Sequence, residues 1–231
     1  MISLSVWAGD LSRVLGNALA MVPASAQVNA IGVLAYSDMF AAVGTDGYIA
    51  GRDHTAPRSF RGDPYRANQP FLIAREHAAE IERFARIDPE RVMPSGKTGG
   101  PRKASESIEI TISDEMFEVA SGGVTRSYPI ARDERQQRIV GTVAELLDQD
   151  TPEYPLGALN RPVMVNPELF GRFGKIKPDK AGRMADLFIQ RDPGAEDIGP
   201  ILVKIGPTFR GLIQPVDRAV NAKNIGQDGL W

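Results

Sequence analysis

Residues Ser95 to Gly100, SGKTGG, contain the Gly-Lys-Thr sequence that ends a phosphate-binding P-loop. The P-loop pattern is G-x-x-x-x-G-K-[ST], in which the first glycine lets the backbone curl until several N–H groups point at one phosphate. Counted back from Gly96, that glycine belongs at the position that Arg91 occupies. The glycines and proline after Thr98 also break the helix that should follow. We therefore predict a flexible, basic surface loop here rather than a nucleotide site.

The two histidines give little support to catalysis. Asp53 precedes His54, but adjacent residues on a strand point to opposite faces, and no third partner is close in sequence. His77 follows Glu76 on a predicted helix and is expected at the surface. No His-x-x-x-His spacing marks a metal site, and no Gly-x-Ser-x-Gly nucleophile elbow occurs. We expect no enzyme, no cofactor and no metal; an α+β enzyme without a recognisable motif remains an alternative.

Composition limits the class of protein. The chain has 231 residues, is 42% hydrophobic and 24% charged, and carries a net charge of −2, so it can bury a core and is not basic overall. It contains no cysteine, which excludes disulfides, thiolate catalysis and cysteine-bound zinc. The sequence lacks a run of 18 apolar residues and the features of a signal peptide, so we expect a cytoplasmic protein.

A strand–helix–three-strand pattern opens the chain. Residues 2–9 alternate with the period of a half-buried strand, and Asp10 is predicted to cap a helix over residues 11–22 whose apolar residues share one side. Asp46-Gly47 separates two strand-like runs and is typical of a tight hairpin. The three predicted strands are residues 30–37, 39–46 and 48–55.

The same pattern occurs twice more. The second copy has a strand at 70–74 and a helix at 75–87, followed by strands at 107–113, 116–121 and 124–131. In the third copy Asn166 is expected to cap a helix, with Pro167 at its first position. Its predicted elements are a strand at 161–165, a helix at 168–176, and strands at 183–190, 200–206 and 209–217.

Residues 132–160 contain no clear full copy, only a helical piece at 140–147, and are interpreted as a linker or an eroded repeat. We therefore predict two domains and a tail. Residues 1–131 form the first domain from two units, and residues 132–220 form the second, with a short or eroded first unit and a second unit at 161–217. Residues 221–231 form a flexible C-terminal tail.

This internal repetition resembles the DNA sliding clamps, the ring-shaped processivity factors of DNA polymerases. The resemblance covers most of the chain. It rests on LSRVLGNALAMVP followed by VLAYSDMFAAVGTDG near the start, on the Glu153–Pro155 sequence EYP, and on FRGLIQPVD near the end. The last sequence is similar to the final strand of bacterial clamps, although Gln214 stands where those clamps have methionine.

The resemblance implies an α+β fold, with repeated β-α-β-β-β units and helices on one face of curved antiparallel sheets. It implies a protein that encircles duplex DNA without reading its sequence and tethers a DNA polymerase, with a clamp loader as a further partner. Bacterial clamps carry six units and close as dimers, whereas viral and eukaryotic-type clamps carry four and close as trimers. Three units and a remnant favour a homotrimer, with a monomer or incomplete ring as the alternative, and suggest a phage or another mobile element.

A sliding ring needs basic side chains that contact phosphates, and we expect them on the exposed helix faces. For the second helix, ordinary Glu–Arg pairing at the surface is an alternative. The predicted DNA-facing residues are Arg13, Arg75, Arg83, Arg86, Arg172, Lys175, Lys177, Lys180 and Arg183.

Two features near the C-terminus suggest partner binding by analogy with the family. Leu212, Gln214, Pro215 and Val216 are candidates for an apolar peptide-binding pocket, although an ordinary strand in a core explains them as well. The tail residues Gln227, Leu230 and Trp231 have the Gln-x-x-Leu-aromatic spacing of peptides that dock into bacterial clamps, or belong to a frayed terminus. A clamp-fold interaction protein that does not encircle DNA is therefore the alternative function.

Overall fold

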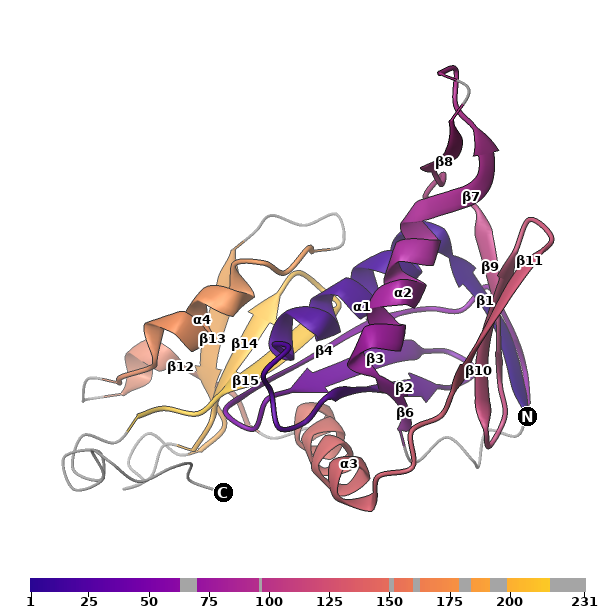
Figure 1. Cartoon of the computed structure of the whole chain (residues 1–231). Coiled ribbons are helices and arrows are strands. Elements are labelled where there is room, and N and C mark those ends of the chain that lie inside the picture. The colour runs from indigo at the N-terminus through magenta and orange to yellow at the C-terminus, as the bar shows by residue number, and fades with distance from the viewer. Residues whose placement is uncertain are drawn as a thin grey trace.

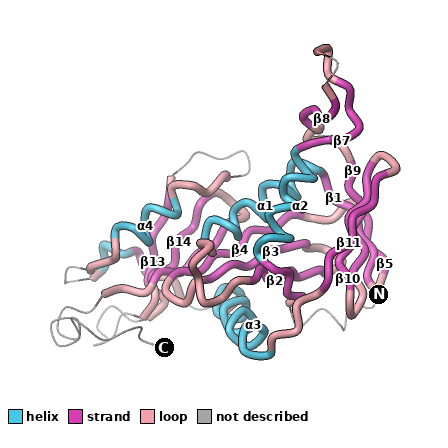
Figure 2. Tube along the Cα trace, in the orientation of Figure 1, coloured by secondary structure: helices cyan, strands magenta, loops and turns pink. Residues whose placement is uncertain are grey.

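The computed structural model describes residues 1–62, 70–95, 97–149, 152–159, 163–178, 184–191 and 199–216. Its elements are four α-helices and two large antiparallel sheets, with a two-stranded hairpin that projects beyond the end of one helix (Figures 1 and 2).

The first two predicted units are confirmed. The first consists of β1 (Ile2–Trp7), α1 (Ala8–Met21), β2 (Ala30–Ala35), β3 (Phe40–Thr45) and β4 (Ile49–Thr55). The second consists of β6 (Phe71–Ala74), α2 (Arg75–Arg86), β9 (Ser107–Ile112), β10 (Met116–Ser121) and β11 (Val124–Pro129). The sequence did not indicate β5 (Ser59–Arg61) or the hairpin of β7 (Ile87–Val92) and β8 (Thr98–Pro101).

The predicted cap of the first helix is wrong. The helix begins at Ala8, with Trp7 as its N-cap, and Asp10 lies in its first turn. The N–H groups of Ala8 and Gly9 donate to the carbonyl oxygens of Glu106 and Ala104, at 2.8 and 3.0 Å. The chain of the second unit thus satisfies the helix terminus, so no capping side chain is required.

The third unit is shorter than the other two. Its helix is α4 (Pro167–Phe173), and its strands are β13 (Ala185–Ile189), β14 (Ile201–Ile205) and β15 (Phe209–Ile213). Asn166 is the N-cap, as predicted, and its Oδ1 accepts a hydrogen bond from the Glu168 N–H at 2.9 Å. Residues 163–165, which the sequence predicts as a strand, lie outside the sheets.

Helix α3 (Glu134–Asp148) precedes this unit and is longer than the helical piece predicted at 140–147. It is followed by β12 (Tyr154–Pro155) and a 3-10 turn, η2 (Leu156–Ala158). The first two units each begin with a strand followed by a helix, and β12 followed by η2 repeats that order on a smaller scale. The predicted boundary between residues 131 and 132 stays a prediction, since one sheet runs through both parts.

Strand order shows how the units combine. The five-stranded sheet has the order β11-β10-β9-β1-β5, and the eight-stranded sheet has the order β12-β13-β14-β15-β4-β3-β2-β6. The first strand of each complete unit pairs with the other unit, because β1 joins β9 and β6 joins β2. β12 joins β13 in the same way. The front and middle of the chain are therefore related by pseudo-symmetry, and a third sheet segment repeats the arrangement.

Two layers of helix cover the eight-stranded sheet. Helices α1, α2 and α4 lie on one face, whereas α3 lies on the opposite face (Figure 1). The expectation of helices on one face thus holds for the helices of the three units, and α3 is an addition to it. Alternate residues of a strand serve the two layers, since Val33 packs toward α1 and Leu34 toward α3.

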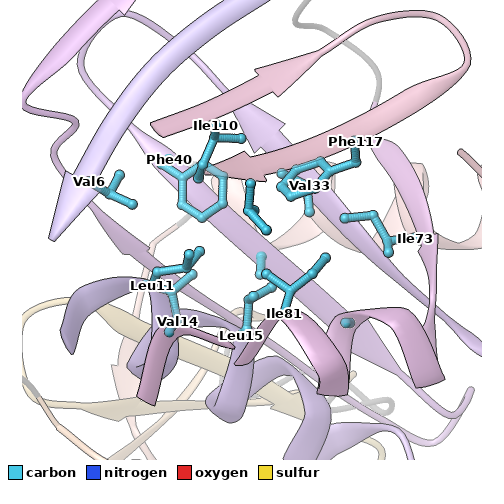
Figure 3. Close-up of a cluster of buried hydrophobic side chains, with 14 of the residues drawn as sticks. Val6, Leu11, Val14, Leu15, Val33, Phe40, Ile73, Ile81, Ile110 and Phe117 are labelled. Atoms are coloured by element: carbon cyan, nitrogen blue, oxygen red, sulfur yellow. The ribbon is translucent and has the colours of Figure 1, made fainter. Parts of the chain in front are cut away.

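The main core lies between both sheets and the helix pair α1–α2. Apolar side chains from α1, α2 and both sheets converge there (Figure 3). Phe40 and Phe117 are among its largest fully buried side chains. A smaller cluster connects the third unit to the first, with Met21 and Ile49 packed against Phe173 and Phe209.

Candidate nucleic-acid interface

The face formed by α1, α2 and α4 is the predicted DNA-binding side, but α1 presents little of itself to solvent. Every residue of α1 is buried or half-buried. The helix contacts α2, α4 and the sheet strands β3 and β4. The exposed charge of this face must therefore come from α2, α4 and the segments that follow them.

Arg13 is not part of the exposed basic set. Its Nη1 lies 2.5 Å from the Asp53 Oδ2, and Asp53 is fully buried. The same guanidinium donates to the Thr208 Oγ1 at 2.9 Å and to the His54 carbonyl oxygen at 3.0 Å. The prediction that Arg13 faces DNA fails because its charge is neutralised inside the protein, next to the apolar side of α1.

Asn17, one turn further along α1, completes this buried network. Its Nδ2 donates to the Asp53 Oδ2 at 2.7 Å and to the Lys177 carbonyl oxygen at 2.9 Å, and its Oδ1 accepts from the Lys177 N–H at 2.8 Å. Together with the contact from Arg13 to Thr208, these bonds join the first unit to two places in the third, the segment after α4 and the turn before β15. The network has a structural role in the described part of the molecule.

His54 lies beside the same network. Burial, and next the positive charge of Arg52, lower the pKa of His54 below its ordinary value. Asp53 is engaged by Arg13 and Asn17 and is not placed to act as the partner of His54 in catalysis. Among the described residues, no group of three or more His, Asp or Glu side chains is arranged to hold a metal ion.

Helix α2 carries a charge gradient. Glu76 and Glu80 are exposed in its first half, and Arg83 and Arg86 are exposed in its second half. Arg86 is paired with Glu82, with its Nε 2.7 Å from the Glu82 Oε1. The basic end of α2 is therefore a candidate phosphate contact, partly balanced by its own carboxylates.

Arg75 is at the opposite end of α2 and has a local role. Its side chain is half-buried, and its Nε donates to the Val22 carbonyl oxygen at 2.7 Å. Val22 is the C-cap of α1, so Arg75 satisfies a carbonyl at the end of that helix.

The basic residues in and after α4 divide into three groups. Arg172 is half-buried and forms an ion pair with Asp46, so part of its charge is used within the protein. Lys175 and Lys177 are exposed. Lys180 and Arg183 lie outside the described residues.

The hairpin β7–β8 adds basic residues in a region where the sequence predicts only a surface loop. Arg91, Lys97 and Lys103 are exposed on or beside it, and it extends beyond the basic end of α2 (Figure 1). A strand rather than a helix follows the Gly-Lys-Thr sequence, which agrees with the absence of a P-loop pattern. The hairpin was missed because its strands contain Pro89, Gly99 and Gly100, which normally indicate a break.

The predicted peptide pocket does not appear as an open apolar surface. Leu212 is 6% exposed and belongs to the core that α3 covers on the outer face of the sheet. Gln214, Pro215 and Val216 are half-buried just after β15. The tail residues Gln227, Leu230 and Trp231 lie outside the described residues.

Comparison of the structure with solved structures identifies its fold. The DNA polymerase III beta of Caulobacter crescentus superposes with a TM-score of 0.60 at 15% identity, covering 93% of this chain and 65% of that one. The chain has the DNA sliding-clamp fold. At this sequence identity the likeness shows the fold and does not assign a function to the chain.

Other clamp structures agree. The DNA polymerase III subunit beta of Pseudomonas aeruginosa gives a TM-score of 0.59 at 11% identity, with 94% of this chain and 67% of that chain covered. The sliding clamp of Bacillus subtilis gives 0.52 at 9% identity, with 93% and 64% covered. The chain therefore spans about two thirds of the length of these clamp chains. No protein-family model and no curated protein sequence matches it.

The comparison shows the fold that carries the helix-side basic residues but assigns no role to any of them. In the described part of the chain, no helix combines the length and apolarity needed to cross a bilayer. Of the predicted basic residues that the structure describes, Arg83, Arg86, Lys175 and Lys177 are exposed on α2 or just after α4, and Arg91, Lys97 and Lys103 are exposed on or beside the hairpin.

Proposed function

We propose that this protein is a DNA sliding clamp, which encircles duplex DNA as part of a cytoplasmic assembly and holds a DNA polymerase on its template. The observation that carries the proposal is the sliding-clamp fold, with its unit helices gathered on one side of the sheets (Figure 1). The proposed action is topological and needs no catalytic group.

The charge on the helix side suits weak, mobile binding. Arg83, Arg86, Lys175 and Lys177 are exposed there and can neutralise phosphates without reading bases. A closed ring would leave DNA slowly because an interface must first open, while a few phosphate contacts would still allow it to slide. The homotrimer, the clamp loader and the phage-like source expected from the sequence belong to this proposal as predictions.

The decisive experiment compares DNA topology. The protein is assembled on a nicked circular duplex, with the appropriate loader or at high protein concentration, and then separated from free protein by gel filtration. A ring stays with the circle and is lost when a restriction enzyme linearises it, and it is retained again when the ends are blocked. Equal retention on circular and open linear DNA would exclude encirclement.

A pair of charge variants tests which face meets the duplex. Arg83→Gln with Lys175→Gln removes two exposed charges from the helix side, and Arg135→Gln with Arg138→Gln removes two exposed charges from α3 on the opposite face. Each lost phosphate contact should reduce the slope of log K against log salt by about 1. The first variant should therefore lose a slope of about 2, and the second should match the wild type. The reverse result would place DNA on the α3 face.

A second function is favoured by the modest charge of α2. Helix α2 contains three acidic residues, Glu76, Glu80 and Glu82, beside the basic residues Arg75, Arg83 and Arg86. Helix α1 contributes no exposed residue to this face. Both facts suit a clamp-fold protein that binds a replication or host protein without surrounding DNA. Such a protein would bind its partner equally with and without DNA and would show no dependence on DNA topology.

A further inference from the structure

The connection that follows the helix differs between the first two units. In the first unit, residues 22–29 connect α1 to β2, whereas in the second unit, residues 87–106 connect α2 to β9. The second connection is more than twice as long, and it contains the hairpin β7–β8. Because both units share the order of one strand, one helix and three strands, the hairpin is an addition to the repeated unit, and the fold of the repeat does not explain it.

Arg102 fixes the base of this hairpin to the body of the protein. Its side chain is buried, with the Nε donating to the Phe84 carbonyl oxygen at 3.2 Å and the Nη1 donating to the Ser121 Oγ at 2.8 Å. The Arg102 N–H donates to the carbonyl oxygen of Arg86, the last residue of α2, at 2.8 Å. The hairpin therefore starts from a fixed base and extends beyond the end of α2 (Figure 1).

The acidic residues of this segment lie mostly at that base. Asp88 and Glu106 are half-buried, and their carboxylates lie 4.0 Å from the Arg102 Nη2 and 3.7 Å from the Arg102 Nη1. Glu90 is the remaining acid of residues 87–106 and is exposed. The exposed charge of the hairpin and its flank is therefore positive, since the exposed cations are Arg91, Lys97 and Lys103.

Arg91 is held in place across the two strands. Its Nη1 donates to the carbonyl oxygen of Pro101 on the opposite strand at 2.6 Å. Its stem packs over Gly100, because a Cβ added to Gly100 would lie 3.1 Å from the Arg91 Cδ. A side chain that is already held in one place loses less conformational freedom when it binds. Arg91 is thus prepared to meet an anion.

The hairpin has the surface chemistry of a phosphate-binding element. Phosphate contacts usually come from Lys, Arg and hydroxyl side chains, whereas the centres of protein interfaces are enriched in Trp, Tyr and Arg. Beside its cations, the hairpin exposes the hydroxyl groups of Ser95 and Thr98. In the part of the chain that the structure describes, the large hydrophobic side chains that are exposed lie elsewhere, at Met1, Trp7, Tyr48 and Met184. A nucleic-acid backbone is therefore a better match than an apolar protein surface.

We propose that the hairpin β7–β8 is a basic arm that contacts phosphates of duplex DNA beyond the stretch that faces the helices. This contact depends on the proposed function, which puts the duplex on the helix side. Arg83 and Arg86 are exposed toward the end of α2 from which the arm projects, so the arm extends an existing basic surface (Figure 1). A two-stranded ribbon fits a major groove about 12 Å wide, which brings phosphates on both sides of the groove within reach.

Charge removal measures the contact. Lys97→Gln with Lys103→Gln removes two exposed cations and leaves the bond from Arg91 to Pro101 intact. Each lost phosphate contact lowers the slope of log K against log salt by about 1, so this variant should lose about 2 in binding to a short linear duplex. The matched control, Arg135→Gln with Arg138→Gln, removes the same charge from α3 on the opposite face and should keep the wild-type slope.

Shortening the arm tests the same contact in a second way. Asp88 and Gly100 are paired across the hairpin, so residues 89–99 can be replaced by Asn-Gly, which forms a two-residue hairpin turn. The shortened protein keeps Arg102 at the base and loses Arg91 and Lys97. It should unfold at the wild-type temperature and lose about 2 in the salt slope.

A cross-link locates the arm on DNA without removing any charge. The natural chain contains no cysteine, so Ser95→Cys can carry a single photoreactive group at the exposed end of the hairpin. This variant should cross-link to duplex DNA, with a yield that falls as salt is raised. Thr142→Cys, which is exposed on α3, is the control and should give a low yield at every salt concentration.

The outcomes separate the arm from the proposed clamp function, because retention on circular DNA is measured independently. Wild-type slopes in both hairpin variants, with equal cross-linking from Ser95→Cys and Thr142→Cys, would overturn the arm even if the wild type stays on circles. Lowered slopes in a protein that circles do not retain would support the arm and exclude encirclement. A shortened protein that binds DNA like the wild type but no longer binds a DNA polymerase would make the hairpin a protein-binding element and overturn the proposal.

Discussion

The first 131 residues and the part after residue 152 contain the same meander of strands, but they differ in how far strand exchange and helix packing join their units. In the first part, β1 and β6 are exchanged between two units, and α1 and α2 pack side by side over both sheets. Among the residues of the second part that the structure describes, the exchanged strand is the two-residue β12, and α4 has seven residues, of which Phe173 is the buried one. The third unit therefore completes its core with residues of the first.

This difference explains why the buried polar network lies where it does. A closed pair of units can be held by apolar packing alone, whereas the third unit has less apolar surface to offer. Arg13, Asn17 and Asp53 compensate with directed bonds to Thr208 and Lys177. We expect the two parts to respond differently to substitutions, and the following predictions begin with the largest effect.

Removing Asp53 should have the largest effect. Asp53→Ala removes the fully buried partner of Arg13 and leaves only the Asp10 carboxylate, 3.5 Å from the Arg13 Nη2; breaking a buried pair in this way typically costs about 3–5 kcal/mol of unfolding free energy. Because the network joins both parts, amide protection should also fall around Thr208 and Lys177. Denaturant unfolding and hydrogen exchange measure the two effects.

The control replaces both charged residues. Arg13→Leu with Asp53→Leu substitutes apolar groups for the ion pair, and such replacements are often close to neutral. The double variant should recover most of the stability lost in Asp53→Ala. A loss of less than about 1 kcal/mol in Asp53→Ala would show that the two parts do not depend on this network.

Two glycines test how firmly each helix is seated. A Cβ at Gly44 would lie 2.2 Å from the carbonyl oxygen of Ala18 in α1, where backbone must move. A Cβ at Gly211 would lie 2.4 Å from the Phe173 ring of α4, a side chain that can turn, although the Ala50 carbonyl oxygen is 3.0 Å away. Gly44→Ala should cost about 3 kcal/mol and Gly211→Ala about 1 kcal/mol in chemical unfolding. Equal costs would mean that α4 is seated as rigidly as α1.

The helix caps give the smallest effect and differ in pH dependence. The Asp133 carboxylate accepts from the Gln136 N–H at 3.0 Å at the start of α3, and hydrogen bonds from Gln136 lower the pKa of Asp133 below its ordinary value of 3.8. A lowered folded-state pKa stabilises the protein above pH 3.8, and this stabilisation is lost as pH falls through the folded-state pKa. Asp133→Ala should therefore destabilise at neutral pH, with a difference from wild type that shrinks in acid.

Asn166 is the matched case because an amide cap does not titrate. Asn166→Ala should cost about 1 kcal/mol at the start of α4, equally at pH 3 and pH 7. Thermal unfolding of both variants across that range makes the comparison. A pH-dependent loss in Asn166→Ala would point to another titrating group near α4.

Much of the fold could be predicted from local patterns. Strand alternation in residues 2–7 and the apolar side of 75–86 specify their elements, and the Asn166-Pro167 pair specifies the start of α4. The hairpin β7–β8 could not be predicted, since its strands pair outside the body of the protein and carry the glycines and proline of a loop. Helix α3 could be predicted only in part, and its place on the opposite face could not.

The candidate site was predicted less well than the fold. Arg83, Arg86, Lys175 and Lys177 are exposed as expected, but Arg13 is buried and Arg75 and Arg172 are used in local bonds. In sequence, an arginine beside an apolar stripe is indistinguishable from an exposed one. The acid that neutralises Arg13 of α1 is Asp53 on strand β4, and it becomes a neighbour of Arg13 only after folding.

The sequence by itself determined the repeated units, because the periods of two and 3.6 residues are local properties of strands and helices. Only the tertiary structure decided how the units exchange strands, that α3 covers the outer face, and that β11 is left at an edge. Those outcomes depend on which distant segment supplies the next hydrogen-bonding or apolar surface, and no local pattern records that choice.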